Sequence, residues 1–260
     1  PINSISIRDR SLRIRRDTPT DAPTLARLYS DMAVHTNGNV DRIDFFWKRI
    51  RDYRGTPTQG YVFEGAAGVE GYLFLLKRLP PNTGSLLSYN TVFLTDMTAA
   101  TPAAARCMLT FIADHYSLCD TVTWFGGCTD SVWQLLPRET FMQSSLRAHW
   151  MLRIVHCEAA LAARGYSPFV SGEIHLDIRD DVLPGNNQRI VLAVRDGRGS
   201  VTTGGRGDLR IDVRGLAAMY AGFYTPPELR MAGLLDGDEK NAGLLSAACA
   251  GPASWMRDPF

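Results

Sequence analysis

Cysteines are few in this sequence and follow no regular spacing. The five lie at Cys107, Cys119, Cys128, Cys157 and Cys249, with no CxxC pair among them. A disulfide-stapled secreted domain uses an even and regularly spaced set, and a structural zinc site uses closely spaced pairs. We therefore expect a cytoplasmic location, and we expect no metal.

Long hydrophobic runs and an excess of one charge are also lacking. No apolar stretch reaches the roughly 18 residues that a membrane span needs, and the opening residues 1–16 contain no signal-peptide core. The 28 Lys and Arg residues are balanced by 27 Asp and Glu residues, which gives a net charge of +1. Because duplex nucleic acids and anionic membranes attract strongly basic surfaces, we expect neither as a partner. The balanced charge favours a small ligand or a protein as the binding partner.

Complete catalytic motifs are missing as well. There is no GxSxG elbow for nucleophilic hydrolysis. Gly204, Gly205 and Gly207 precede a predicted strand, whereas a phosphate-binding loop precedes a helix; we interpret them as a hairpin turn. Asp238 is interpreted as a helix N-cap rather than as part of a calcium loop.

What is present is a clear succession of strand and helix patterns in the first 154 residues. Apolar residues at helical spacing follow a short strand, and alternating β-rich runs follow the helices. The expected order is a strand at 11–15, a helix that Asp21 caps and Pro23 enters at its first turn, a helix at 41–51, strands at 60–65, 69–79 and 86–95, a helix at 103–116, and strands at 121–125 and 146–154.

From residue 155 the pattern restarts as a second sheet-and-helix unit. A short helix at 157–164 is followed by the strands GEIHLDI, QRIVLAV and LRIDV, and then by helices near 213–221, 227–232 and 239–249. The sequence therefore predicts an α+β protein of two domains, 1–154 and 155–260.

The order of elements in the first domain resembles that of the GNAT acyltransferases. In that family the central strand is followed by an R/Q-x-x-G-x-G/A loop, whose amide groups hold the pyrophosphate of coenzyme A at a helix N-terminus. The corresponding loop here, Met97 to Ala103, has neither the arginine nor the glycines. We therefore interpret the domain as a degenerate GNAT-like mixed sheet flanked by helices, which does not bind acetyl-CoA in the usual way.

The whole chain resembles the Eis (enhanced intracellular survival) acetyltransferases. The resemblance is carried by IRRDTPTDAPTLARLY, FFWKRI, HWMLRIVHCEAALAARGY, DDVLPGNNQRIVLAV, LRIDVRGLAAMYAG and the ending GPASWMRDPF. Those enzymes join an acetyl-CoA-binding GNAT half, a degenerate GNAT half and a domain like a sterol carrier protein. The resemblance covers the last two parts, and implies that acetyl-CoA is bound by an N-terminal half absent from this chain.

The resemblance also implies site residues. The terminal Phe260 matches a residue whose free α-carboxylate takes the proton from the substrate amine, and burial would raise the basicity of such a carboxylate. Trp255, Met256 and Phe260 favour a docked tail, since a free tail gains nothing from exposed aromatic side chains. Trp47 matches an aromatic residue of the amine pocket. Met32 stands where the family has another aromatic residue, which puts the breadth of substrates in doubt. Core packing is the alternative role for both.

The implied reaction is acetyl transfer from acetyl-CoA to a primary amine of the aminoglycoside or lysine kind. The resemblance also implies an assembly of several identical copies. The alternative is a non-catalytic module of sterol-carrier type that binds an apolar ligand or serves in assembly. The chain begins with Pro1, either because an initiator methionine was removed or because the sequence is a piece of a longer one. Both interpretations stay open.

Overall fold

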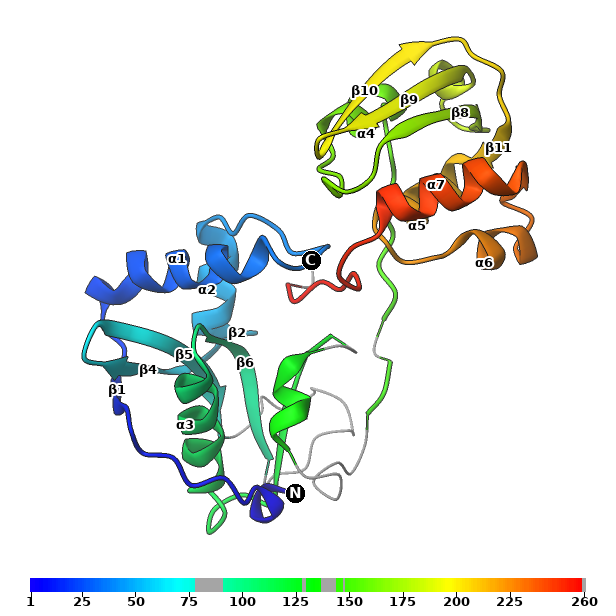
Figure 1. Ribbon diagram of the computed structural model, residues 1–260. Helices are drawn as coiled ribbons and strands as arrows, with labels where there is room; N and C mark the ends of the chain where they lie inside the picture. Colours follow the sequence, from blue (N-terminus) through cyan, green and yellow to red (C-terminus); the bar gives the residue numbers. More distant parts are fainter. Residues whose placement is uncertain (78–90, 128–129, 137–143, 147, 259–260) are drawn as a thin grey trace. The chain divides into compact units, whose positions relative to one another are not determined.

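The computed structural model describes residues 1–77, 91–127, 130–136, 144–146 and 148–258. These residues form two compact units, Pro1–Arg147 with Trp255–Phe260, and Ala148–Ser254 (Figure 1). These compact units divide after Arg147, and the residues from Trp255 onward belong to the first unit. The division into the domains 1–154 and 155–260 stays a prediction.

The first unit is built on a mixed five-stranded sheet in the order β1-β4-β5-β6-β7. Strand β6 pairs antiparallel with β5 and parallel with β7, while β1, β4 and β5 pair antiparallel. The strands are β1 (Arg13–Arg16), β4 (Gln59–Gly65), β5 (Gly68–Leu76), β6 (Thr91–Ala99) and β7 (Thr121–Trp124), and the helices are α1 (Ala22–Ala33), α2 (Asp44–Arg51) and α3 (Pro102–Ala113); β2 (Asp52–Tyr53) and β3 (Thr56–Pro57) form a separate small pair.

Helices pack on both faces of this sheet. One hydrophobic cluster joins α3 and the N-terminal residues Ile2 and Ile5 to Leu73, Leu75 and Leu94 of the strands. A second cluster joins residues of α1 and α2 to the opposite side chains of β4 and β5, which are Val62, Tyr72 and Phe74. Both faces are buried, which explains why β5 has a nearly continuous apolar sequence instead of a strict alternation.

A β-bulge at Thr95 changes the face of the sheet toward which the following side chains of β6 point. Phe74 and Leu75 are consecutive on β5, yet they pair with Asp96 and Leu94, so Thr95 is the extra residue. Leu94 lies in the cluster beneath α3, whereas Asp96 hydrogen-bonds to Tyr72 of the opposite cluster. Without the bulge, period-two alternation would place Leu94 and Asp96 on one face. The bulge thus turns Asp96 toward α1 and α2.

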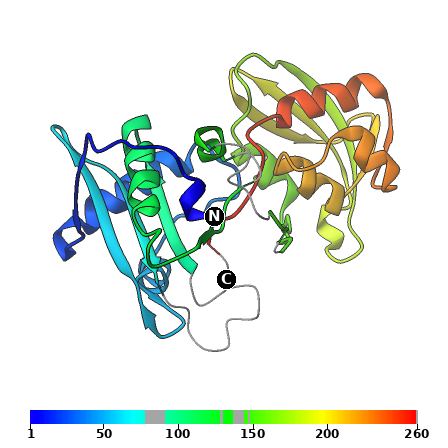
Figure 2. The same cartoon turned by 90° about the horizontal axis from the view of Figure 1, so that it is seen from below.

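The second unit is a five-stranded sheet in the order β10-β9-β8-β11-β12, with helices on one face (Figure 2). A single core joins α4, α5, α6 and α7 to Ile174, Leu176 and Ile178 of β8. The elements are α4 (Cys157–Ala163), β8 (Gly172–Arg179), β9 (Arg189–Arg195), β10 (Arg198–Thr203), β11 (Leu209–Asp212), α5 (Val213–Tyr220), α6 (Pro226–Met231), β12 (Leu235–Gly237) and α7 (Glu239–Cys249).

Two expectations about this region are wrong. No strand forms in the described part of 146–154; Met151 is 96% exposed, and Arg153 is held by an ion pair with Asp180 rather than by a strand partner. The glycines at 204, 205 and 207 do not form a hairpin turn, because β10 pairs with β9 while β11 pairs parallel with β8. They form a crossing loop with positive φ angles of 71–102°, which glycine adopts without strain.

Most other elements are close to their expected bounds, and the α+β fold class is confirmed. Asp238 caps α7, with its carboxylate accepting from the backbone N–H of Asn241 at 2.8 Å. Asp21 precedes α1, but its carboxylate accepts from Thr18 and pairs with Arg15 instead of capping the helix. The expected strand residues 78–79 and 86–90 lie outside the described residues. Within the described ranges, no helix is long and apolar enough to cross a membrane.

Candidate functional site

The end of the chain, Trp255–Asp258, packs into the first unit. The backbone N–H of Trp255 donates to the carbonyl of Asn37 at 3.0 Å, and the indole of Trp255 lies so close to Gly127 that a Cβ there would come within 2.6 Å of it. Asp258 is only 5% exposed. The expected docking of the tail is confirmed for these four residues, and Phe260 itself lies outside the described residues.

Arg42 lies at the centre of the contacts beneath the tail. It stands in the segment between α1 and α2, and its guanidinium donates to both oxygens of Asp96, at 2.6 and 3.1 Å. Its Nε donates to the carboxylate of Asp258 at 2.9 Å. The side chains of Arg42, Asp96 and Asp258 are 1%, 0% and 6% exposed. One buried cation therefore joins the sheet to the tail.

Arg257 makes the reciprocal contact. Its Nη1 donates to Asp96 Oδ1 at 3.2 Å, to Thr98 Oγ1 at 3.1 Å and to the backbone carbonyl of Met97. Asp96 therefore receives two arginines, one from the body of the unit and one from the tail. Arg42, Asp96, Arg257 and Asp258 together are hereafter called the tail latch; their four formal charges sum to zero.

Two buried tyrosines complete the polar cluster. Tyr72 donates to Asp96 at 2.9 Å and accepts from Thr98 at 3.2 Å. Tyr29 donates to the carbonyl of Val40 at 2.8 Å, its hydroxyl lies 3.3 Å from Asp258, and the guanidinium of Arg42 stacks 3.7 Å above its ring centre. A buried charge is tolerated where it is paired and hydrogen-bonded on all sides.

The protonation states follow from this arrangement. Burial opposes ionisation of Asp96, but the positive charges of Arg42 and Arg257 outweigh it and hold the Asp96 pKa below its ordinary value. Burial likewise disfavours the charge on Arg42, yet Asp96 raises the Arg42 pKa above its ordinary value. Burial raises the pKa of Tyr29 to about 12. Asp96 is thus a carboxylate and Tyr29 a neutral hydroxyl at neutral pH.

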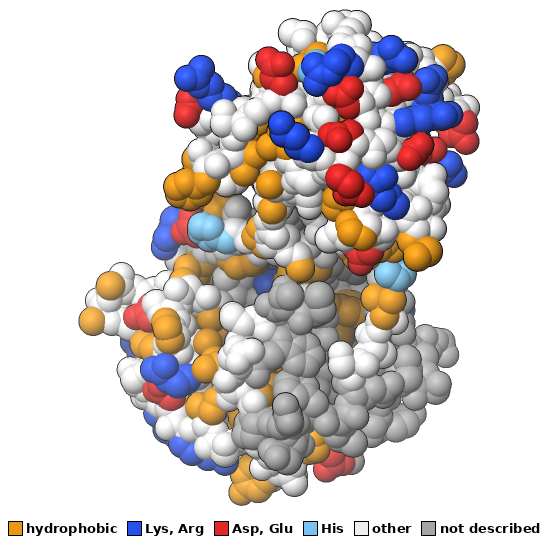
Figure 3. All heavy atoms as spheres, turned by 45° about the vertical axis from the view of Figure 1, so that its right-hand side comes forward, with side chains coloured by type: hydrophobic (Ala, Val, Ile, Leu, Met, Phe, Trp, Pro, Cys, Tyr) orange, Lys and Arg blue, Asp and Glu red, His pale blue; other side chains and the backbone are white. Residues whose placement is uncertain are grey.

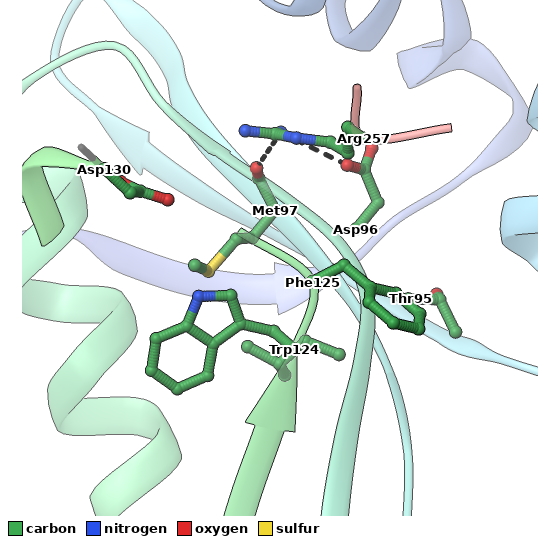
Figure 4. Close-up of a pocket in the computed structure, with 8 residues that line it drawn as sticks. Thr95, Asp96, Met97, Trp124, Phe125, Asp130 and Arg257 are labelled. Atoms are coloured by element: carbon green, nitrogen blue, oxygen red, sulfur yellow. Dashed lines mark hydrogen bonds and ion pairs between the residues drawn. The ribbon is translucent and has the colours of Figure 1, made fainter. Parts of the chain in front are cut away.

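A hollow opens in the first unit where β6 and β7 part. The two strands pair only from Thr91 to Leu94 on β6. Beyond that point Figure 4 shows Trp124 and Phe125 at the end of β7 opposite the residues after Leu94, with Arg257 reaching across to Asp96 and Met97. The remaining cavity is about 10 Å³, which holds about one water molecule. Arg257 is the tail residue among those that line this cavity.

The N-terminus of α3 is the place where a GNAT domain would bind pyrophosphate. Here Thr101 caps the helix, accepting from the N–H of Ala104 at 3.1 Å, and Pro102 supplies no N–H in the first turn. The carboxylate of Glu70 lies against this cap, accepting from Thr101 Oγ1 at 2.6 Å. A negative carboxylate beside an already capped terminus repels an anionic phosphate. These contacts agree with the loss of the glycine-rich loop in the sequence.

Of the two pocket residues expected from the sequence, Trp47 lies near the tail latch. Trp47, on α2, is half-buried, with its ring edge-on to Tyr29 at 6.2 Å and near Tyr72 at 6.1 Å; the guanidinium of Arg42 lies 5.0 Å from its centre. Met32, on α1, is half-buried, and its sulfur lies 4.0 Å from the amide nitrogen of Asn39.

The sequence analysis missed the latch residues. One signal was available: Asp96 interrupts the apolar strand TVFLTDMTA, and an acidic residue at a buried strand position requires a cationic partner. Its partners Arg42 and Arg257 are 54 and 161 positions away in the chain. No local pattern joins residues at such separations.

Acidic and basic side chains are interspersed on the face of the second unit seen in Figure 3, whereas nucleic-acid sites gather cations in one patch. In the part of the chain that the structure describes, no three His, Cys, Asp or Glu side chains are grouped to hold a metal ion.

Comparison with known proteins identifies both parts of the chain. Residues 38–154 match the acetyltransferase (GNAT) domain, and residues 157–257 match the sterol carrier protein domain. A GCN5-related N-acetyltransferase from Anabaena variabilis has a similar structure, with a TM-score of 0.89 and 32% identity over 100% of this chain. Eis1 from Mycobacterium abscessus has the same fold, with a TM-score of 0.70 and 24% identity over 97% of this chain.

A curated relative, an uncharacterized N-acetyltransferase from Streptomyces griseus, is 28% identical over 176 residues, which are 66% of this chain. The chain spans 41% of the length of that relative, 66% of the Anabaena protein and 64% of Eis1. It carries a GNAT acetyltransferase domain followed by a sterol carrier protein domain.

Proposed function

We propose that this chain, with its GNAT domain and its sterol carrier protein domain, is part of an N-acetyltransferase of the Eis kind that moves acetyl from acetyl-CoA to a primary amine. The observation that carries the proposal is the docked tail. Four tail residues pack into the GNAT-like unit, and Phe260, which we propose as the terminal residue, follows the buried Asp258 by two positions. An acyl transfer to an amine needs a fixed base, and a held chain terminus supplies a carboxylate.

In the proposed reaction the amine nitrogen attacks the thioester carbonyl of acetyl-CoA directly. The new C–N bond forms as the C–S bond breaks, and coenzyme A leaves as its thiolate, which then takes up a proton. The α-carboxylate of Phe260 accepts the proton that the amine nitrogen loses. Removing this proton lowers the barrier, because the nitrogen would otherwise hold a positive charge as the bond forms.

Trp47 and Met32 are proposed to line the wall of the amine pocket. Trp47 is half-buried beside the polar cluster, and an aromatic face attracts a cationic ammonium group. Met32, an unbranched and adaptable side chain, lies on α1, three residues after Tyr29. We propose an amine of the aminoglycoside or lysine kind.

Acetyl-CoA is proposed to bind to a second, N-terminal GNAT half that is not in this sequence. The capped N-terminus of α3, with the Glu70 carboxylate against it, supports this, as does the length of the relatives beyond the matched part. We further propose a cytoplasmic protein that assembles from several identical copies, with its domains divided near 154.

Titration of the 260-residue chain with acetyl-CoA, followed by isothermal calorimetry, tests the proposal. We expect no heat of binding from this chain. A polypeptide that adds an acetyl-CoA-binding GNAT half should bind acetyl-CoA and acetylate amines. Tight binding of acetyl-CoA by the 260-residue chain would contradict the assignment of the cofactor to another segment.

A further inference from the structure

Two neighbouring residues of the tail carry opposite charges, and each contacts a buried partner of opposite sign. Arg257 pairs with Asp96 of β6 at 3.2 Å, and Asp258 pairs with Arg42 at 2.9 Å. Arg42 and Asp96 also pair with each other, at 2.6 Å. Each charge of the tail latch therefore has a neighbour of opposite sign, and the tail adds no net charge to the buried cluster.

This alternation of charge favours one register of the tail over registers shifted by one residue. If the tail slipped by one residue toward its end, Met256 would stand in place of Arg257, and Arg257 would face Arg42 in place of Asp258. A buried like-charge contact and an unpaired carboxylate are both strongly unfavourable. Apolar contacts alone would not discriminate in this way, because hydrophobic burial has no direction.

Phe260 follows Asp258 by two positions in the sequence. A tail held at Asp258 is therefore held close, along the chain, to the residue that we propose as the base.

We propose that Arg42, Asp96, Arg257 and Asp258 are positioning residues, which act through the tail and hold the terminal carboxylate of Phe260 at the reacting amine. This inference rests on the proposed function, in which that carboxylate is the base. None of the four residues needs to touch the substrate. Their role is to set the register of the tail.

Digestion with carboxypeptidase Y tests the latch without any measurement of activity. The rate of release of Phe260 from the folded chain, followed by mass spectrometry, reports how often the tail is free. Asp258→Asn removes the tail's negative charge without altering the body of the unit. We expect release about ten- to a hundredfold faster, as for the loss of one charge-assisted hydrogen bond. Asp258→Glu, which keeps the charge, should recover part of the protection.

Asp21→Asn is the matched control. Asp21 is also buried and paired with an arginine of the same unit, Arg15 at 2.8 Å, but it belongs to another cluster. We expect it to lower the stability of the unit and to leave the release of Phe260 unchanged at temperatures far below unfolding. Equal release from the parent chain and from Asp258→Asn would overturn the latch.

Steady-state kinetics of a protein that includes the acetyl-CoA-binding half then separate the two proposals. With the latch in its proposed role, Asp258→Asn lowers kcat at least tenfold and leaves the KM for acetyl-CoA unchanged. Faster release of Phe260 with unchanged kcat would uphold the latch as an anchor of the tail, but contradict both its role in positioning the base and the base itself. If Asp258→Asn lowered kcat tenfold but released Phe260 at the same rate as the parent chain, the latch alone would be contradicted.

Discussion

Asp96 is the residue on which both arginines of the latch converge. Its side chain is fully buried, and it accepts hydrogen bonds from Arg42, Arg257 and Tyr72. Because the low local dielectric strengthens the interactions of paired charges and penalises unpaired ones alike, this residue controls the stability of the cluster.

Asp96→Asn should therefore destabilise the first unit by about 3–5 kcal/mol, the usual cost of leaving a buried charge uncompensated. The free energy of unfolding, measured with urea, gives the value. Asp31→Asn is the control, since Asp31 and its partner Arg27 are both more than 60% exposed; it should change stability by less than about 0.5 kcal/mol. Equal effects of the two variants would contradict the buried network.

Tyr29 gives the unit a pH dependence in the alkaline range. Burial raises the Tyr29 pKa to about 12, above the value of about 10 for an unfolded tyrosine. The folded state therefore holds this proton more tightly. The stabilisation is fully present below about pH 10 and is lost as the pH rises through about 12.

Urea unfolding of the parent and of Tyr29→Phe, compared between about pH 9 and pH 11, measures this contribution. The parent should lose stability with rising pH more steeply than Tyr29→Phe, which has no hydroxyl proton to lose. Parallel curves for the two proteins would show that Tyr29 titrates normally.

At the scale of single elements, the tail and the loop after β7 fit closely together. A methyl group on Gly127 would lie 2.6–2.8 Å from three atoms of the Trp255 indole, and closer than 3.0 Å is too near for carbon atoms in van der Waals contact. The indole of Trp255 therefore cannot keep its position if residue 127 is larger than glycine.

Gly127→Ala should displace Trp255 and destabilise the unit by about 1–3 kcal/mol, as overpacking does in other cores. A shift of the tryptophan emission toward longer wavelength would report the exposed indole. The neighbouring Gly126→Ala, whose nearest contact would be 3.2 Å, is the control and should change the emission far less. Identical spectra for both variants would argue against the docked indole.

The N-terminus of α3 depends on Thr101, whose hydroxyl accepts from Ala104 and donates to Glu70. Thr101→Ala should cost about 1 kcal/mol, the usual effect of losing a helix N-cap. Thermal unfolding with Thr101→Ser as the conservative control measures it. If Thr101→Ala and Thr101→Ser are equally stable, the hydroxyl is not the cap.

These elements also show what a sequence can predict. Local chemistry was sufficient for α3, where Pro102 enters the first turn, and for α7, where Asp238 is the cap. The bulge at Thr95 was not predictable, because it depends on the register between β5 and β6, and no residue type marks it. The failed strand at 146–154 has the apolar content of a strand, but its described residues pair with no strand among the residues that the structure describes.

At the scale of the whole molecule, the sequence lists the site residues but does not show which of them lie close together in the fold. The expectation of a docked tail came from aromatic side chains alone, whereas its anchoring depends on Arg42 and Asp96, which are more than 160 positions away from the tail residues they pair with. Residues so far apart in the chain are brought together only when the whole unit has folded. The second unit lies between them in the chain.

The central claim is that the chain terminus is the base of an acetyl transfer. Its most direct test adds one glycine after Phe260 in a protein that joins an acetyl-CoA-binding GNAT half to this chain. We expect kcat to fall by about 10²–10⁴, the usual contribution of a general base, with unchanged urea stability and an unchanged KM for acetyl-CoA. An unchanged kcat would contradict it.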